Sequence, residues 1–153
     1  MAHVYDVARY ILEQKPGITA MKLQKLVYYS QAWSLVWDEA PLFPQSIKAW
    51  ANGPVVGTLY GCHRGHFSVM PDMFPVQSPQ EITGAQGDTI QRVLEFYGDQ
   101  TAQWLSDLTH MEDPWRKARE RAGLADGESG DPEITLADMA EYYSGLMPNE
   151  STQ

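Results

Sequence analysis

The sequence has few of the features that mark secreted or membrane proteins. Its only cysteine is Cys62, so no disulfide can form within the chain, and a secreted disulfide scaffold is excluded. It lacks an apolar run of about 18 residues that could cross a bilayer. The first residues carry Asp6 and Glu13 and lack the uninterrupted apolar stretch of a signal peptide. These absences predict a cytoplasmic protein without membrane contact.

Basic residues are scarce. The 153 residues include 20 acidic and 11 basic side chains, which gives a formal net charge of −9 with histidines neutral. An acidic surface repels phosphate backbones, so we expect no direct DNA binding. Arg116, Lys117, Arg119 and Arg121 are clustered, whereas the chain from Asp126 onward has no Lys or Arg. A solvated helix face explains this charge run, and the alternative is that these segments engage a partner or each other.

Motifs of the common enzyme classes are also lacking. The sequence has no GxSxG, no phosphate-binding glycine loop, no GxGxxG and no HExxH. Soft and imidazole ligands cluster at Cys62, His63 and His66, where the His pair resembles half a zinc site. A small metal-binding enzyme or regulator that uses these three residues is therefore one alternative. We assign no catalytic, cofactor-binding or metal-binding residues and expect neither enzyme activity nor a cofactor.

What the sequence does contain is helical periodicity. Its 43% of hydrophobic residues and its length suit one domain over residues 1–153 with a substantial core. Apolar spacing predicts helices over residues 4–14, about 20–38, 54–62, 90–97, 101–110, 113–123 and 135–147. Thr19, Asp113 and Thr135 are the expected N-caps of three of them. The second helix is apolar over most of its circumference and has only a narrow polar strip, which places it at the centre of the domain.

Proline and glycine mark the parts that are not helical. Residues 47–50 alternate weakly and predict a short strand, and Asn52-Gly53 is a turn signal. We expect an ordered loop over 63–88, a polar linker over 125–133 and a frayed tail over 148–153. The predicted fold is therefore mainly α: a compact single-domain helical bundle of about six helices, with a small extended insert around residues 41–75.

Five tryptophans are many for this length. Trp33 and Trp37 lie one helical turn apart, which predicts that both are core residues. Trp50 and Trp115 lie at the ends of elements, where an aromatic ring can be partly exposed. Such rings are favoured anchors in protein interfaces, although packing is the more common explanation for each of them.

Three segments, read together, resemble the Panacea-domain antitoxins, the family that includes SocA-like and phage-associated GepA-like proteins. The first segment is Met-Lys-Leu-Gln-Lys-Leu-Val-Tyr-Tyr-Ser-Gln-Ala-Trp at residues 21–33. The second is Pro-Leu-Phe at 41–43, followed by Ile-Lys-Ala-Trp-Ala-Asn-Gly-Pro-Val-Val at 47–56 and by Tyr60. The third is Leu-Ser at 105–106 and Leu-Thr-His at 108–110, followed by Pro114-Trp115.

The resemblance implies an antitoxin of a bacterial or phage-borne toxin–antitoxin system with a role in phage defence. Such a protein neutralises its cognate toxin, usually the product of the adjacent gene, by direct protein–protein binding. The toxins of this family include small alarmone-synthetase-like enzymes and other translation-targeting proteins. Some relatives deliver the toxin to a protease instead, and this adaptor role is the nearest alternative function.

The residues expected to contact the partner follow from the turn and corner motifs. They are Trp50, Asn52, Gly53, Pro54 and Val55 in the turn, with Thr109, His110 and Trp115 at the corner. An acidic helical domain suits a toxin with a basic substrate-binding face, because opposite charge speeds encounter while a few buried anchors supply the affinity.

Overall fold

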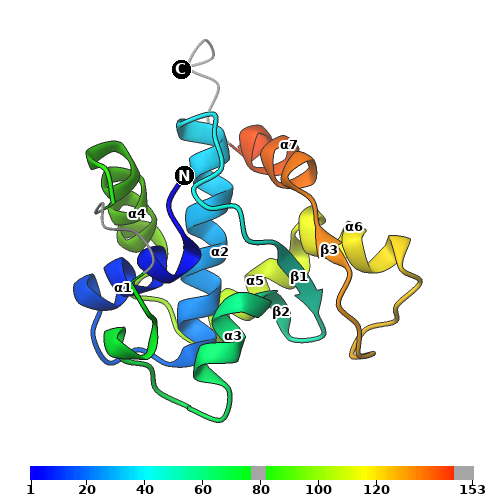
Figure 1. Cartoon of the computed structure of the whole chain (residues 1–153). Coiled ribbons are helices and arrows are strands. Elements are labelled where there is room, and N and C mark those ends of the chain that lie inside the picture. The colour runs from blue at the N-terminus through cyan, green and yellow to red at the C-terminus, as the bar shows by residue number, and fades with distance from the viewer. Residues whose placement is uncertain (77–81, 147–153) are drawn as a thin grey trace.

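The structure is a computed structural model, which describes residues 1–76 and 82–146 (Figure 1). The α-helices in these ranges are α1 (Val4–Gln14), α2 (Ala20–Trp37), α3 (Gly57–His63), α4 (Gly84–Tyr97), α5 (Ala102–Met111), α6 (Asp113–Arg121) and α7 (Leu136–Leu146). The other elements are strands β1 (Ile47–Trp50), β2 (Gly53–Val56) and β3 (Glu133–Ile134) and the 3-10 turn η1 (Pro71–Met73). The mainly α class with a small extended insert is confirmed, with seven helices in the described residues rather than about six.

Helix α2 runs through the middle of the molecule, as its apolar circumference predicted (Figure 1). The Thr19 hydroxyl caps it by accepting a hydrogen bond from the Lys22 amide at 3.1 Å. Helices α1, α4, α5 and α7 and strand β2 all pack against it. Because neighbours cover nearly every side of the helix, its polar strip does not face solvent: Gln24, Lys25 and Gln31 are all buried.

The strands form a three-stranded antiparallel sheet in the order β2-β1-β3. Trp50 pairs with Gly53, so Ala51 and Asn52 form the turn of the β1–β2 hairpin. The prediction of a helix from residue 54 is wrong at its start, because Pro54 pairs with Ala49 in β2 and α3 begins only at Gly57. Strand β2 is an edge strand, where a proline without an amide hydrogen is tolerated.

Two other helix starts differ from the prediction. Helix α4 begins at Gly84 rather than near Ile90, because Thr83 and Gln86 form a reciprocal capping box. The expected loop over 63–88 is therefore shorter and contains η1, and residues 77–81 of it lie outside the described residues. The N-cap position of α6 is Glu112, whose side chain makes no capping hydrogen bond, and Asp113 is the first helical residue rather than the cap.

The C-terminal part follows the sequence closely. Thr135 caps α7 as predicted, since its hydroxyl accepts from the Asp138 amide at 3.1 Å. The polar linker is present, but its last residue, Glu133, pairs with Lys48 in the sheet. The expected tail over 148–153 lies outside the described residues. No helix in the described ranges is long and apolar enough to span a membrane.

Candidate partner-binding site

The fold brings the residues predicted from the turn and the corner into one place. Trp115 Nε1 donates to the Trp50 carbonyl oxygen at 2.8 Å, and the His110 and Trp115 rings lie 4.0 Å apart. Their exposure differs, however. Asn52 is exposed and Trp50 and His110 are half-buried, whereas the buried members are Gly53, Pro54, Val55, Thr109 and Trp115. Trp115 is buried where α6 packs against β1, which agrees with packing, the more common explanation for a tryptophan at the end of an element.

Helix α5 and the start of α6 hold the backbone of the hairpin turn. Ser106 Oγ donates to the Asn52 carbonyl oxygen at 2.7 Å. His110 Nε2 lies 3.0 Å from the Ala51 carbonyl oxygen, and its Nδ1 lies 2.6 Å from that of Ser106. With the bond from Trp115, three consecutive turn carbonyls are fixed.

Side chains of helix α2 form hydrogen bonds with strand β2 of the same hairpin. The Gln24 side chain accepts from the Val56 amide at 2.9 Å and donates to the Val56 carbonyl at 3.3 Å. Both backbone polar groups of Val56, a residue of edge strand β2, therefore have hydrogen-bond partners. Lys25 Nζ donates to the Pro54 carbonyl oxygen at 3.2 Å. Lys25 is only 2% exposed, and this burial lowers the pKa of its ammonium to about 8. Neither ion pair found in the described residues involves Lys25.

Gly53 is the residue that allows this close approach. A Cβ atom at this position would lie 2.8 Å from Lys25 Cε and 3.2 Å from Thr109 Oγ1. Its φ of +123° is also one that side-chain-bearing residues rarely adopt. The Asn-Gly-Pro motif therefore has a physical basis in the packing of the turn on α2 and α5.

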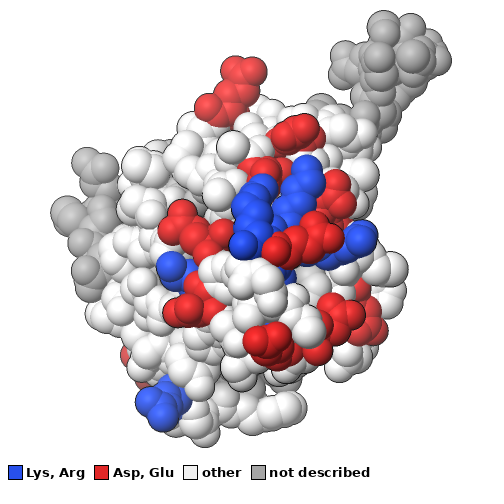
Figure 2. Space-filling view, turned by 90° about the vertical axis from the view of Figure 1, so that its right-hand side faces the viewer, with Lys and Arg blue, Asp and Glu red and all other residues white. Residues whose placement is uncertain are grey.

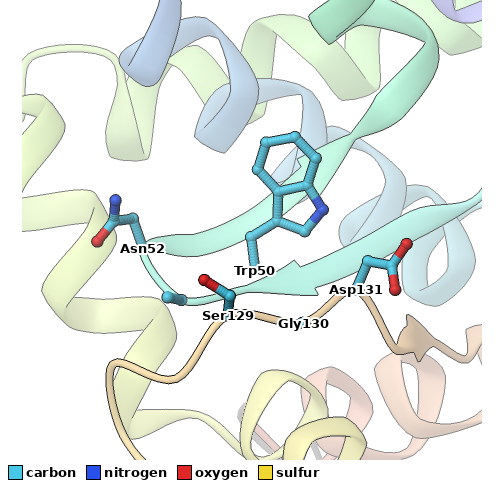
Figure 3. A pocket seen from close by; sticks show the side chains of 6 residues that line it. Trp50, Asn52, Ser129, Gly130 and Asp131 are labelled. Carbon is cyan, nitrogen blue, oxygen red and sulfur yellow. The ribbon is translucent and has the colours of Figure 1, made fainter.

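The chain after α6 forms a second wall beside the hairpin. Buried Arg119 joins the two: Nη1 donates to the Ala49 carbonyl at 2.9 Å, and Nη2 donates to the carbonyls of Ala125 and Glu128. Between the turn and the loop lies an open pocket of about 420 Å³ (Figure 3). Its lining residues are Trp50, Ala51, Asn52, Ser129, Gly130 and Asp131.

A second buried polar cluster lies at the junction of α5 and α6. The Glu112 carboxylate accepts hydrogen bonds of 2.7 Å from the Tyr29 and Tyr143 hydroxyls. Because Tyr143 donates its proton to Glu112, the Tyr28 hydroxyl, 3.0 Å from that of Tyr143, is the donor in their contact. Burial raises the pKa of Glu112, although both hydrogen bonds oppose the shift. The cluster fastens α7 to α2, which is a structural role.

In the described part of the chain, the structure adds no further ligand to the alternative metal site at Cys62, His63 and His66. Gln24 Nε2 lies 2.9 Å from His63 Nε2, and since the Gln24 oxygen already accepts from Val56, the amide nitrogen is the donor here. The lone pair of His63 Nε2 is thus engaged, and burial lowers the pKa of this ring. In residues 1–76 and 82–146, no group of three or more His, Cys, Asp and Glu side chains is placed to hold a metal ion.

The clustered basic residues form a small patch within an acidic surface. Figure 2 shows Lys and Arg side chains gathered on the face that carries α6, with Asp and Glu side chains around them. Arg116 and Arg121 are exposed, whereas Arg119 is buried. Arg121 pairs with Asp138 of α7, so the basic helix and the acidic segment engage each other at this point.

Sequence reasoning missed several residues that shape the site. Lys25 lies in the 21–33 motif and Arg119 in the basic cluster, but their bonds to the hairpin, like the position of Asp131, depend on segments far away in the chain. One signal was available for Gln24 and Lys25. A central helix that is covered on all sides has to bury its polar side chains as well, and each then needs a partner.

The comparison with known families identifies the family of this chain. The model of the family described as antitoxin SocA-like, Panacea domain, matches residues 23–116, which is more than half of the chain. The chain therefore belongs to the Panacea-domain family of SocA-like antitoxins. The matched range includes the β1–β2 hairpin and its donors on α2 and α5. No curated protein and no solved structure matches the chain significantly.

Proposed function

We propose that this protein is an antitoxin that neutralises its cognate toxin by direct protein–protein binding, with the toxin encoded by the adjacent gene. Family membership carries this proposal. The site supports it, because side chains of α5 and α6 bond three carbonyl oxygens of the hairpin turn, which presents Trp50 and Asn52 beside an open pocket. A rigid, partly exposed aromatic residue is a suitable interface anchor, since little side-chain freedom is lost on binding. The protein is proposed to act in the cytoplasm, without turnover.

The charge of the molecule favours a toxin with a basic face. The net charge is −9, and acidic side chains surround the basic patch on the face of α6. A toxin that acts on RNA or on nucleotides binds phosphate through Lys and Arg. A small alarmone-synthetase-like toxin or another translation-targeting toxin would present such a face. An antitoxin bound there would block the substrate sterically.

The test is co-expression with the product of the adjacent reading frame. We expect that product to arrest growth alone, and co-expression to restore growth and allow co-purification of the two proteins. Rescue should persist in strains that lack the housekeeping proteases, because binding alone suffices. Rescue that requires a protease, with a falling toxin level, would favour the adaptor function instead.

Point variants test whether residues of the candidate site are needed for the rescue of growth. Trp50→Ala and His110→Ala should weaken rescue and co-purification, while Trp104→Ala is the matched control, an exposed tryptophan on α5 that does not line the pocket. Folding of each variant is checked by its thermal unfolding. Full rescue by folded Trp50→Ala and His110→Ala proteins would remove the site from the proposal, and a neighbour that is toxic but not rescued would refute the function for that pair.

A further inference from the structure

The pocket between the hairpin turn and the loop after α6 has two walls that are fixed before any partner arrives. On one wall, the carbonyl oxygens of Trp50, Ala51 and Asn52 are bonded to side chains of α5 and α6. On the other, Arg119 holds two loop carbonyls, and the Ala49 amide donates to the Pro132 carbonyl at 2.7 Å. A pocket with fixed walls binds without the entropic cost of ordering them.

The side chains at the pocket present unused polar groups beside an aromatic ring. In Figure 3 the Trp50 indole lies between Asn52 and Asp131, whose side chains point away from each other, and the Tyr60 ring contacts the indole in a T-shaped arrangement with ring centroids 4.8 Å apart. Asn52 and Asp131 are both exposed. Neither ion pair of the described residues includes Asp131, and no side-chain hydrogen bond found there uses the Asn52 amide. These groups are therefore available to a partner.

Among charged side chains, the loop that forms one wall of the pocket carries acidic ones only. Residues 125–133 include Asp126, Glu128, Asp131 and Glu133 and no Lys or Arg. The Arg119 guanidinium is buried and committed to backbone carbonyls. An aromatic face beside a carboxylate suits a planar cation, because a guanidinium stacks on the ring while its N–H groups bond the carboxylate. The ammonium of lysine lacks this planar fork.

We propose that the Trp50–Asn52–Asp131 pocket is the subsite that receives an arginine side chain of the toxin. The inference rests on the proposed function for the identity of the partner, but the chemistry of the pocket can be tested without a toxin. Capture of an arginine that contacts phosphate in the toxin's own substrate would remove that contact while the complex persists. Asp131 supplies the charge, and Trp50 supplies the stacking surface.

The first experiment measures the pocket alone. The purified protein is titrated with the tripeptide acetyl-Gly-Arg-Gly-amide and, separately, with the same peptide containing neutral citrulline, while amide and indole NMR signals are recorded. We expect saturable shifts at Trp50, Asn52 and Asp131 with the arginine peptide and binding weaker by about tenfold or more with citrulline. Asp131→Asn should weaken arginine binding to the citrulline level, and Asp126→Asn, on the same loop but outside the pocket, should leave it unchanged. Equal responses to both peptides, or none, would overturn the proposal.

The second experiment separates the subsite from the function. In the growth-rescue assay, Asp131→Lys should lose rescue, whereas Asp126→Lys should retain it. If the unchanged protein rescues growth and Asp131→Lys rescues it equally well, the arginine subsite is wrong while the antitoxin function stands. If the unchanged protein does not rescue growth, the function fails for that toxin, and the peptide titration still decides the pocket.

Discussion

At the scale of single residues, Lys25 is a charge buried beneath the hairpin at a cost to stability. Burial lowers the pKa of its ammonium from 10.5 to about 8, which corresponds to about 3 kcal/mol against the folded state at neutral pH. The single hydrogen bond to Pro54 offsets only about 1 kcal/mol of this. The polarity of this position is therefore not explained by stability alone.

We expect Lys25→Met to raise the free energy of unfolding at pH 7 by about 2 kcal/mol. A lysine whose pKa is lower in the folded protein than in the unfolded chain destabilises fully below the folded pKa. The penalty disappears as pH rises from about 8 to 10.5. The free energies of unfolding of the two proteins, measured in urea, should therefore converge over this pH range. Both proteins contain the same tyrosines, so any contribution of these residues cancels in the difference. A gap that stays constant with pH would contradict the assignment.

Glu112 is the corresponding buried acid. Because burial raises its pKa in the folded protein, its cost is absent below the unfolded pKa and grows as pH rises through the folded value. Glu112→Gln keeps an oxygen that accepts from Tyr29 and Tyr143, so we expect it to be at least as stable as the unchanged protein at pH 7. The free energies of unfolding of Glu112→Gln and of the unchanged protein, measured with a chemical denaturant, should converge as the pH falls toward about 4.

Glu112→Ala is the contrasting variant. It leaves two buried tyrosine hydroxyls without an acceptor, and we expect a loss of about 2–4 kcal/mol at all pH values. If Glu112→Gln lost as much stability as Glu112→Ala, the carboxylate charge would be essential, and the assigned direction of its pKa shift would be wrong.

At the scale of elements, the β1–β2 hairpin depends on a glycine. Gly53→Ala would place a Cβ atom 2.8 Å from Lys25 Cε at a φ of +123°, so we expect a loss of about 2–3 kcal/mol. Gly123→Ala is the matched control, because Gly123 also has a positive φ but has open space around it, and it should lose only about 1 kcal/mol. Thermal unfolding measures both. Equal losses would show that contact with Lys25 does not restrict this position.

The same elements show how far sequence reasoning reaches. The helices at Thr19 and Thr135 were predicted because their caps are local signals. Pro54 was misassigned because proline suits both the first turn of a helix and an edge strand, and only the pairing with Ala49 decides between them. The turn motif located the centre of the site. Its walls could not be predicted, because Arg119 on α6 and Asp131 in a loop with no periodic pattern reach the site only through contacts between distant segments.

At the scale of the whole molecule, the net charge of −9 predicts how the complex forms. Opposite charges speed encounter and are screened by salt, whereas buried anchors set the dissociation rate. We expect the association rate with the toxin to fall on the order of tenfold as ionic strength rises from dilute buffer to well above the physiological level. The dissociation rate should change little. Surface-coupled kinetics measure both, and an association rate insensitive to salt would contradict the charge argument.

The central claim is that this protein blocks its toxin by occupying it. The most direct measurement is a titration of the purified toxin's activity with this protein, in the absence of proteases and of any other polypeptide. The account predicts that activity falls in proportion to the amount added and reaches its minimum at a fixed stoichiometric ratio, with the toxin intact. Complete inactivation by a small fraction of that amount, or chemical change in the toxin, would contradict it.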